Sequence, residues 1–305
     1  MTKAVCVLVD WGTSNLRLWA VTAEGEATDM RRSDQGMSKL APDMFAPTLQ
    51  NLLSDMQIDE NAPILMCGMV GAASGWQEAR YLDAPTKIDK LAEAVIHIEH
   101  EKRDIRIIPG VAQRLAEAPD VMRGEETLLL GLAQNTGQIL LPGTHSKWVR
   151  MQDGNLTGFR TVMTGEIFAL LKNHSIVRHT LSPSQWQQDV FLDAVQAGFS
   201  TPEAMLNQIF SLRAGPLLFG SDVSPDGTSR LSGWLIGAEI ATSYQTDAGP
   251  LTLVSDGDLG THYVDALSAL DIAFSQANAT QAAQAGLLAC AQKIWPDIFR
   301  LNISD

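Results

Sequence analysis

Two short segments, far apart in the chain, combine the residue types that bind phosphate. Residues 8–17 read Leu-Val-Asp-Trp-Gly-Thr-Ser-Asn-Leu-Arg, and residues 142–149 read Pro-Gly-Thr-His-Ser-Lys-Trp-Val. Glycine lets the backbone approach an anion, while hydroxyl, N–H and basic groups supply donors and positive charge. The shared order predicts two strand-turn-strand hairpins that clamp a polyphosphate through Gly12, Thr13, Ser14, Arg17, Gly143, Thr144, His145 and Lys147.

A carboxylate stands directly before the first of these turns. Asp10 ends the apolar run that leads into Gly12. A carboxylate beside a phosphate site repels the ligand unless a divalent cation lies between them, which is how magnesium is commonly held in nucleotide sites. We therefore expect Asp10 to organise Mg²⁺, through a bridging water. The alternative is that a single Gly-Thr turn is only a turn.

A pair of acids follows a glycine between the two hairpins. Residues 121–131 read Val-Met-Arg-Gly-Glu-Glu-Thr-Leu-Leu-Leu-Gly. Glycine, acids and then an apolar run predict a helix that begins at Glu125, where the helix dipole stabilises a carboxylate. Glu125 and Glu126 could equally be ordinary acids of a first helical turn.

Composition excludes several classes of partner. The 305 residues include 45% hydrophobic and 19% charged residues, as in soluble globular proteins long enough for two domains. The net charge of -13, with 22 basic and 35 acidic residues, argues against nucleic acid and anionic membranes. Cys6, Cys67 and Cys290 lie far apart in apolar runs, which predicts free buried thiols in a cytoplasmic protein. We expect neither export nor membrane insertion.

The pattern of apolar runs and glycines predicts an α/β chain whose second half repeats the beginning of the first. A meander of three strands opens each half. A helical insertion at about 172–245 delays the next strand of the second half, and Gly233, Gly237 and Ala238 suggest close packing within it. The expected strands are 4–10, 16–22, 26–32, 62–71, 105–109, 137–142, 146–151, 157–163 and 251–255; the expected helices are 43–56, 88–100, a helix from Glu166, 231–243, one after Asp258 and 282–295.

This layout resembles the actin, hexokinase and sugar-kinase architecture. The resemblance implies two ribonuclease H-like domains with a nucleotide and sugar cleft between them, at 1–118 and 119–305. In such kinases the closing cleft excludes water from the transferring phosphoryl group. An acid before the second phosphate turn serves there as base toward the sugar hydroxyl, and Glu125 takes that role by resemblance.

Several longer sequence motifs in the chain resemble those of one family, the 2-dehydro-3-deoxygalactonokinases. They span about residues 5–270 and include 10–17, Gly-Met-Val-Gly at 68–71, 121–127, 142–149, Phe-Arg-Thr-Val-Met-Thr-Gly-Glu at 159–166 and 231–239. The resemblance implies phosphorylation of 2-dehydro-3-deoxy-D-galactonate at its 6-hydroxyl by ATP and Mg²⁺, in cytoplasmic galactonate catabolism. At the family's adenosine turn this chain departs from the usual glycines and small residues and reads Ser255-Asp256-Gly257-Asp258. We expect Gly257 beside the nucleotide, where the added carboxylates either contact the ribose hydroxyls or weaken ATP binding.

The substrate implied by the family is an acid, so its carboxylate should meet a cationic side chain. We favour Arg123 and Arg160 for this contact, with surface or structural ion pairs as the alternative for each. Gly68, Met69 and Trp76 follow a buried strand and would shape the sugar pocket, although packing explains Trp76 equally well. Glu166 is expected to cap a helix, with a metal or substrate role as the alternative.

Three other functions stay open at the level of sequence. A kinase of another sugar or sugar acid would keep Asp10, Thr13, Glu125 and Thr144 and change the sugar contacts. A phosphohydrolase would use water as acceptor. A sugar-sensing regulator would need a DNA-reading module, for which the acidic chain offers no basic helix-turn-helix segment. The oligomeric state, including a homodimer, is also open.

Overall fold

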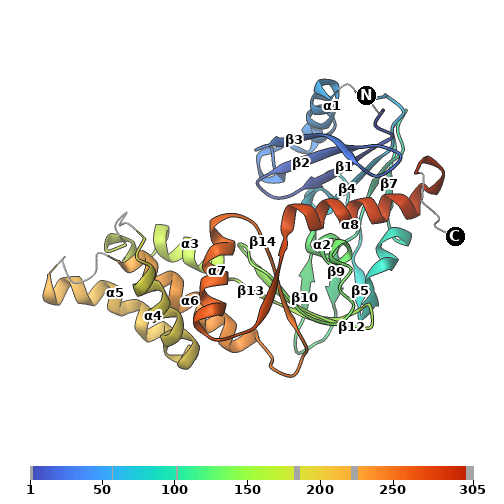
Figure 1. The fold of residues 1–305 in the computed structure, drawn as a ribbon. Coiled ribbons are helices and arrows are strands. Elements are labelled where there is room, and N and C mark those ends of the chain that lie inside the picture. The colour runs from blue at the N-terminus through green and yellow to red at the C-terminus, as the bar shows by residue number, and fades with distance from the viewer. Residues whose placement is uncertain (1–2, 57, 101, 182–185, 221–225, 300–305) are drawn as a thin grey trace. The chain divides into compact units, whose positions relative to one another are not determined.

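The computed structural model describes residues 3–56, 58–100, 102–181, 186–220 and 226–299, as a chain of mixed α/β structure (Figure 1). By compactness the chain divides into two units. Unit 1 contains residues 1–135, 151–158 and 278–305, and unit 2 contains 136–150 and 159–277. The domain boundary at 118/119 inferred from the sequence stays a prediction.

The main sheet of unit 1 begins with the predicted meander. Strands β1 (Cys6–Trp11), β2 (Leu16–Val21) and β3 (Ala27–Ser33) pair antiparallel in succession. Strand β4 (Ile64–Cys67) then joins β1 in parallel, followed by β8 (Ile105–Ile107) and β7 (Ile96–Ile98), so the order is β3-β2-β1-β4-β8-β7. Every residue of β4 is buried, as its unbroken apolar run predicts for a central parallel strand. The predicted extent of 62–71 is wrong at its end, because Gly68 has a positive φ and residues 69–71 form a 3-10 helix.

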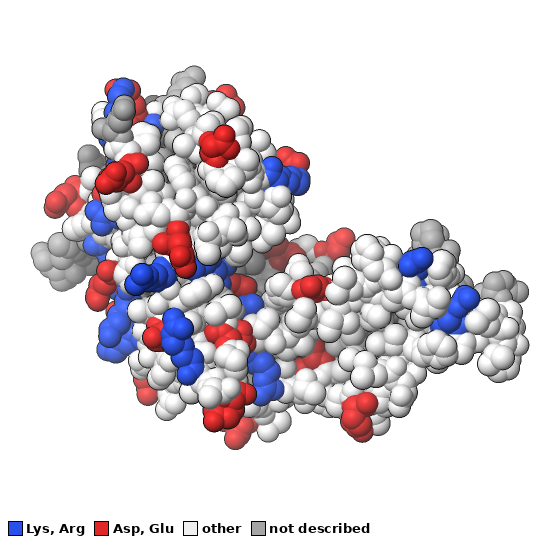
Figure 2. Space-filling view, turned by 180° about the vertical axis from the view of Figure 1, so that it is seen from behind, with Lys and Arg blue, Asp and Glu red and all other residues white. Residues whose placement is uncertain are grey.

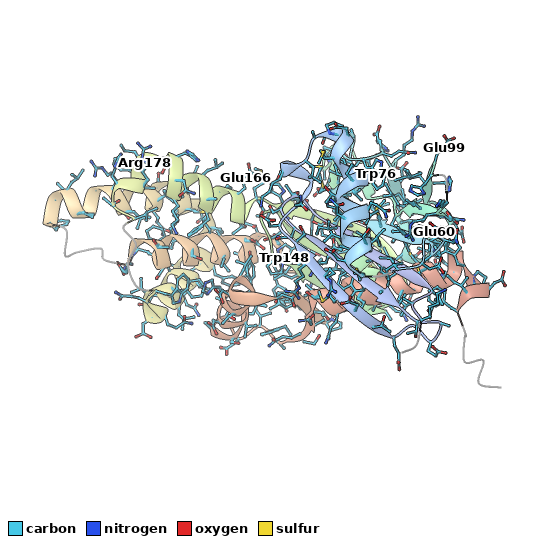
Figure 3. The ribbon with its side chains drawn as sticks, turned by 90° about the horizontal axis from the view of Figure 1, so that it is seen from above. Glu60, Trp76, Glu99, Trp148, Glu166 and Arg178 are labelled. Atoms are coloured by element: carbon cyan, nitrogen blue, oxygen red, sulfur yellow. The ribbon has the colours of Figure 1, made fainter. Side chains whose placement is uncertain are left out.

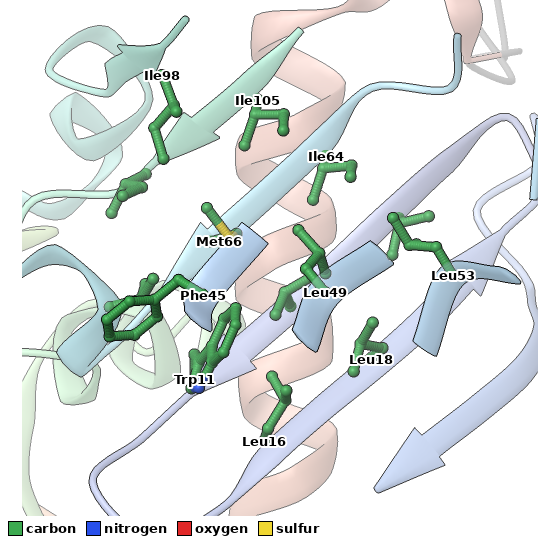
Figure 4. Close-up of a cluster of buried hydrophobic side chains, with 14 of the residues drawn as sticks. Trp11, Leu16, Leu18, Phe45, Leu49, Leu53, Ile64, Met66, Ile98 and Ile105 are labelled. Carbon is green, nitrogen blue, oxygen red and sulfur yellow. The ribbon is translucent and has the colours of Figure 1, made fainter. Parts of the chain in front are cut away.

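Helix α1 (Phe45–Asp55) covers one face of this sheet, and α8 (Ala279–Ile294) packs on β1 and β4. Figure 4 shows the side chains of α1 and the strands meeting in a continuous apolar core in front of α8. Trp11 is fully buried there, with its ring centre 5.3 Å from that of Phe45. The end of β1 is therefore fixed by packing immediately before the first glycine turn.

Unit 1 contains further short elements. Helix α2 (Glu125–Leu132) begins at the predicted residue and crosses α8 closely: a Cβ atom at Gly131 would lie 1.9 Å from the Ala282 carbonyl oxygen. A three-stranded sheet has the order β10-β9-β5. The bounds are β5 (Leu82–Ala84), β6 (Thr86–Lys87), β9 (Val111–Gln113) and β10 (Asp120–Met122), with 3-10 helices η1 (Met37–Lys39), η2 (Pro42–Met44), η3 (Met69–Gly71), η4 (Ile88–Glu93) and η8 (Pro296–Ile298).

The helix predicted over 88–100 is wrong. The segment forms the 3-10 helix η4 and then β7, which pairs antiparallel with β8. Ile96-His97-Ile98 alternates apolar and polar side chains, and Ile98 packs into the core at 4% exposure. Pairing with β8 satisfies the backbone of these β-branched residues better than another helical turn would.

The remaining sheet has the strand order β15-β14-β11-β12-β13-β6. Its strands are β11 (Gly137–Leu141), β12 (Ser146–Gln152), β13 (Asn155–Val162), β14 (Leu251–Ser255) and β15 (Phe274–Asn278). Within unit 2, β11 and β14 pair in parallel, as β1 and β4 do in unit 1. The predicted strands 137–142, 146–151, 157–163 and 251–255 are therefore confirmed in kind, with shifts of one or two residues at some ends.

The insertion between β13 and β14 is helical, as predicted, although residues 182–185 and 221–225 of it lie outside the described residues. Helices α4 (Gln188–Ser200) and α6 (Gly227–Ser243) pack through glycine: a Cβ at Gly237 would lie 2.2 Å from the Val195 carbonyl oxygen, and one at Gly233 2.4 Å from that of Phe191. The bounds are α3 (Thr164–His174), η5 (Ile176–His179), α4 (Gln188–Ser200), η6 (Pro202–Ala204), α5 (Met205–Phe219), α6 (Gly227–Ser243) and α7 (Gly257–Ala269).

Surface charge and cysteine state agree with the sequence analysis. Figure 2 shows acidic and basic side chains interspersed over one face rather than gathered into a basic patch. The three cysteines are free and buried, as predicted. Over the described ranges, no helix is both long and apolar enough to cross a membrane.

Candidate functional site

The first glycine turn is held by hydrogen bonds of its own backbone and by contacts with the loop that contains Gly36. The Gly12 N–H donates to the Asn15 carbonyl at 2.9 Å, and the Ser38 N–H donates to the Thr13 carbonyl at 3.0 Å. A Cβ atom at Gly36 would lie 2.3 Å from the Ser14 carbonyl carbon, so only glycine allows this approach. The Thr13 and Asn15 carbonyls are thus occupied, while Thr13 and Ser14 are exposed.

Asp10 and Arg17, predicted to act on metal and phosphate, form an ion pair across β1 and β2. Both Arg17 Nε, at 3.1 Å, and Nη2 donate to Asp10 Oδ2. Arg17 Nη1 donates to Thr280 Oγ1 at 2.6 Å, which orients the guanidinium from α8. The other Asp10 oxygen, Oδ1, faces Gly68, where a Cβ atom would lie 3.5 Å away. One oxygen is therefore committed to Arg17, and the other lies against a residue without a side chain.

Gly68 has a backbone conformation that favours glycine. Its φ of 91° lies in the region that other residues avoid, and a Cβ would come within 2.8 Å of the Trp11 carbonyl oxygen. The following Met69 begins η3 and is partly buried. Gly68 thus brings the ends of β1 and β4 together, next to the first turn.

The N-terminus of α2 carries both acids that the sequence singled out. The Arg123 N–H donates to Glu125 Oε2 at 3.0 Å, and the Gly124 N–H reaches both Glu126 oxygens, at 2.9 and 2.8 Å. Glu125 is partly exposed, whereas Glu126 is fully buried. Burial, together with the neighbouring charge of Glu125, raises the pKa of Glu126 to about 8. The two adjacent acids therefore differ in chemical character.

Arg123 is a partly buried cation with few protein partners. Its Nη2 donates to the Ala79 carbonyl at 2.8 Å, and its guanidinium lies 4.4 Å from the Tyr81 ring centre. Its Nε and Nη1 atoms are buried without a hydrogen-bond partner in the described part of the chain. Unsatisfied buried donors on a charged group are costly, so they call for an explanation such as a ligand.

Trp76 packs against the core of unit 1. Its ring stacks on Phe45 with centres 6.4 Å apart, and it also contacts the edge of Trp11. Figure 3 labels Trp76 beside α1, the helix that contains Phe45. Packing accounts for these contacts, and its role in a sugar pocket stays a prediction.

The second glycine turn is held by the start of α3. The Glu166 N–H donates to the Thr144 carbonyl at 3.0 Å, and a Cβ at Gly165 would lie 2.5 Å from the Gly143 carbonyl oxygen. His145 Nε2 lies 2.5 Å from Glu166 Oε2, and both side chains are partly exposed. Glu166 in the first turn of α3 therefore pairs with the turn itself, and Figure 3 shows it on that helix.

A buried carboxyl group lies beneath this second turn. Glu239, on α6, accepts hydrogen bonds from Trp148 Nε1 at 2.9 Å, from the Tyr263 hydroxyl at 2.6 Å and from the Thr164 hydroxyl. Ser146 contacts both Tyr263, at 3.1 Å, and Glu239. Burial raises the pKa of Glu239, and these donors oppose the shift. The group connects β12, α3, α6 and α7 around the turn.

Two other predicted cations of unit 2 lie in different surroundings. Lys147 is the second residue of β12 and is only 5% exposed. Arg160 is exposed, and its Nη1 donates to the Thr242 carbonyl at 2.7 Å, in the last turn of α6. That contact suits a cation at a helix C-terminus. The phosphate role of Lys147 and the substrate role of Arg160 stay predictions.

A cavity of about 130 Å³ opens beside Gly143 within unit 2. Its aromatic and apolar walls come from α3, α6, α7 and the residues before α4, and include Phe168, Trp186, Ile236, Leu259 and His262. The Trp186 and His262 rings stack with centres 3.9 Å apart, and His262 Nδ1 is buried without a partner among the described residues. Burial lowers the pKa of His262, so the ring is neutral at pH 7. Gly257, whose φ is 67°, is the first residue of α7. It lies in the same first turn of that helix as Leu259, which lines the cavity.

The structure thus groups the predicted residues into two half-sites. In unit 1 it brings together Asp10, Arg17, Gly68 and the start of α2; in unit 2 it joins the second turn to α3. Sequence reasoning missed the supports beneath the turns, Gly36 and Glu239, and the stacked pair Trp186 and His262. A lone acid in the otherwise apolar and small-residue run 231–240 was the available signal for Glu239.

The two units repeat one plan. The strand orders β3-β2-β1-β4-β8 and β13-β12-β11-β14-β15 are the same when each meander is numbered from its first strand. Each has its first and fourth strands parallel and a Gly-Thr turn between its first two strands. This duplicated ribonuclease H-like topology defines the class of actin- and hexokinase-like phosphotransferases.

Comparison with known proteins identifies the family within this class. The family model of 2-keto-3-deoxy-galactonokinase matches residues 10–290, and the chain belongs to that family of kinases. It is 41% identical to a probable 2-dehydro-3-deoxygalactonokinase of Rhizobium meliloti (strain 1021), over 97% of this chain and 99% of the relative. It is 34% identical to the 2-dehydro-3-deoxygalactonokinase of Escherichia coli (strain K12), over 94% and 98%. A crystal structure from Sinorhizobium meliloti under the same enzyme name superposes with a TM-score of 0.90 at 40% identity, covering 97% of this chain and 99% of that one.

Proposed function

We propose that the protein transfers the γ-phosphoryl group of ATP to the 6-hydroxyl of 2-dehydro-3-deoxy-D-galactonate. Family membership supports the reaction class, and the similar kinases are named for this sugar acid. The observation in the molecule that carries most weight is the half-site of unit 1, where the Asp10–Arg17 pair and the acidic start of α2 meet at Gly68. The reaction would serve galactonate catabolism in the cytoplasm, where ATP is available.

Asp10 is the residue that would hold Mg²⁺. Its Oδ2 is occupied by Arg17, while Oδ1 faces Gly68, which has no side chain. Within the described residues no group of three or more His, Cys, Asp or Glu side chains forms a metal cage. A single carboxylate suits Mg²⁺, which keeps several waters and takes further oxygens from substrate phosphates. When bound, the ion would neutralise charge on the transferring phosphoryl group.

Glu125 would accept the proton of the sugar hydroxyl. It is partly exposed at the first turn of α2, and its Oε2 accepts the Arg123 N–H. The helix dipole favours the ionised carboxylate there. Because phosphoryl transfer depends mainly on alignment and charge neutralisation, the base contributes less than the groups around the phosphates.

Arg123 would bind the carboxylate of the sugar acid. Its Nε and Nη1 are buried and lack protein acceptors among the described residues, and a planar guanidinium matches a carboxylate in two bonds. Gly71 makes room for it, since a Cβ there would lie 3.0 Å from Nη1. Arg160, already bound to the end of α6, is the second candidate.

The nucleotide would engage unit 2. The Gly143-Thr144-His145 turn would donate to its phosphates, and the adjoining aromatic cavity would take the base, with His262 Nδ1 as an available polar contact. Asp256 and Asp258, which flank Gly257, would face the ribose hydroxyls. Flat aromatic walls with a few polar groups are typical of such pockets.

A coupled ADP-release assay with Mg²⁺, against 2-dehydro-3-deoxy sugar acids and neutral hexoses, tests the proposal if phosphorylated products are identified by mass. We expect the 6-phosphate of the galactonate derivative and little turnover of neutral sugars. Glu125→Gln should lower kcat by roughly 100-fold or more, whereas Glu117→Gln, on the exposed loop before β10, should not. Activity confined to another sugar would reject the substrate, and ADP release without a phosphorylated sugar would indicate a phosphohydrolase.

A further inference from the structure

Glu126 is the buried acid beside the proposed base. Its side chain has 0% exposure, and its hydrogen bonds come from the Gly124 N–H, from its own backbone N–H and, at 3.4 Å, from the Thr127 hydroxyl. In the described part of the chain, no lysine or arginine forms an ion pair with it. A buried carboxylate without a cationic partner is strongly disfavoured, so the neutral acid is the form this environment prefers.

The groups that face Glu126 from the packed elements do not offset its burial, although two backbone N–H groups and Arg123 act against the rise in its pKa. Glu125 adds a like charge from the same turn, and Arg123 acts on it without a direct bond. Cys67 at the end of β4 and Cys290 on α8 are buried thiols whose pKa values are raised, so both are neutral. Beyond Cys67 lie Asp10 and Arg17, which neutralise each other, and beyond Cys290 lies Lys293.

A proton on Glu126 would have an acceptor. The Thr127 hydroxyl also makes a hydrogen bond with the Cys67 thiol. Because hydroxyl hydrogens rotate, the acid can donate to Thr127 Oγ1 while Thr127 donates to sulfur. The carboxyl's other oxygen continues to accept the Gly124 N–H, so the neutral form satisfies every group in this chain of contacts.

Glu126 holds the turn at Gly124, which directly precedes Glu125. Gly124 has φ 110°, and a Cβ there would approach the Gly68 Cα at 3.4 Å. Fixing the Gly124 N–H therefore fixes the start of α2 against the end of β4. We propose that Glu126 is a positioning residue that stays protonated during turnover and, by holding Gly124, keeps Glu125 aligned; this inference rests on the proposed role of Glu125 as base.

The test is the pH dependence of kcat for the full-length wild type, Glu126→Gln, Glu126→Ala and the exposed control Glu117→Gln. Glutamine imitates the neutral acid, so Glu126→Gln should stay within about three-fold of wild type at pH 7. Glu126→Ala should lose about 10- to 100-fold in kcat, with little change in KM, because misalignment of a catalytic group costs this much. Above pH 8 the wild type and Glu117→Gln should lose activity through ionisation of Glu126, and Glu126→Gln should not.

Equal losses in Glu126→Gln and Glu126→Ala, or an alkaline limb that persists in Glu126→Gln, would overturn the inference. Infrared difference spectroscopy gives a readout besides activity: the wild type at pH 7 should show a protonated-carboxyl band that is missing in Glu126→Gln, and its presence in both would count against the assignment. Failure of the proposed function is separate, because it would appear as an inactive wild type or an active Glu125→Gln.

Discussion

The two glycine turns arise from similar sequences but have different electrostatic surroundings. Beside the first, Asp10 pairs with Arg17, a cation at every physiological pH. Beside the second, Glu166 pairs with His145, which carries charge only when protonated. The first pair sits between two strands at 15% and 25% side-chain exposure, and the second is more open to solvent. The first pair is therefore shielded between strands and has a permanent cation, whereas the second is solvent-exposed and depends on the protonation of His145.

The buried glutamates near the two turns, Glu126 and Glu239, also have different surroundings. Glu239 receives hydrogen bonds from side chains of several elements, whereas Glu126 accepts from two backbone N–H groups and one distant hydroxyl. Burial raises the pKa of both. The donors around Glu239 oppose the rise in its pKa, and Glu126 has fewer donors to oppose the same effect. The repeated sequence pattern thus fixes the turns without fixing the surroundings of the buried acids.

The largest expected effect separates the two ion pairs. Asp10→Asn should lower kcat by at least about 100-fold, because it removes the charge that would organise Mg²⁺ next to the phosphates. Glu166→Gln should change kcat by less than about 10-fold, since an exposed pair contributes little. Steady-state kinetics at saturating ATP measures both. Comparable losses in the two variants would break the distinction between the turns.

The next effect concerns Glu239. Glu239→Ala should destabilise the protein by at least about 3 kcal/mol, because the donors of Trp148, Thr164 and Tyr263 lose a buried acceptor. Trp148→Phe, which leaves only Oε1 without its donor, should cost roughly 1–3 kcal/mol. Urea unfolding followed by circular dichroism reports both values. Wild-type stability in Glu239→Ala would mean that the network is not a structural support.

A third pair of variants asks which unit binds the substrate carboxylate. Arg123→Met should raise KM for the sugar acid by roughly 10- to 100-fold, as expected for the loss of a charge-assisted contact. Arg160→Met, which removes only the contact with Thr242, should leave KM nearly unchanged. Initial-rate kinetics with varied sugar acid distinguishes the two. The opposite ranking would transfer the carboxylate site to unit 2.

The smallest expected effect is on the pH dependence of the free energy of unfolding. The pKa of Glu126 is about 8 in the folded state against an ordinary value of 4.5, so the folded protein binds the extra proton and loses stability as pH rises between these values. Between pH 7 and 8 the wild type should lose about 1 kcal/mol more than Glu126→Gln. Unfolding curves of both proteins at pH 7 and pH 8 test this. An equal loss of stability in the wild type and in Glu126→Gln would mean that Glu126 in the folded protein does not titrate in this pH range.

Much of the fold follows from local patterns. The meanders, the buried run of β4, the start of α2 at Glu125 and the packing of Gly233 and Gly237 were predictable, because each depends on periodicity or on glycine within a few residues. The segment 88–100 was not, since its last residues form a strand only when β8 is present as a partner. Neither was the small sheet of β5, β9 and β10, whose strands are three residues long.

The sequence alone determined which chemical groups are present and in what order: two phosphate-type turns, an acid before the first, and an acid pair at a helix start. These features are encoded locally, in neighbouring residues. Only the tertiary structure decided that Arg17 would neutralise Asp10, that Glu125 and Glu126 would meet different environments, and that Glu239 would be surrounded by donors. Burial and pairing depend on residues far apart in the chain, such as Thr164 and Glu239, and no local pattern records them.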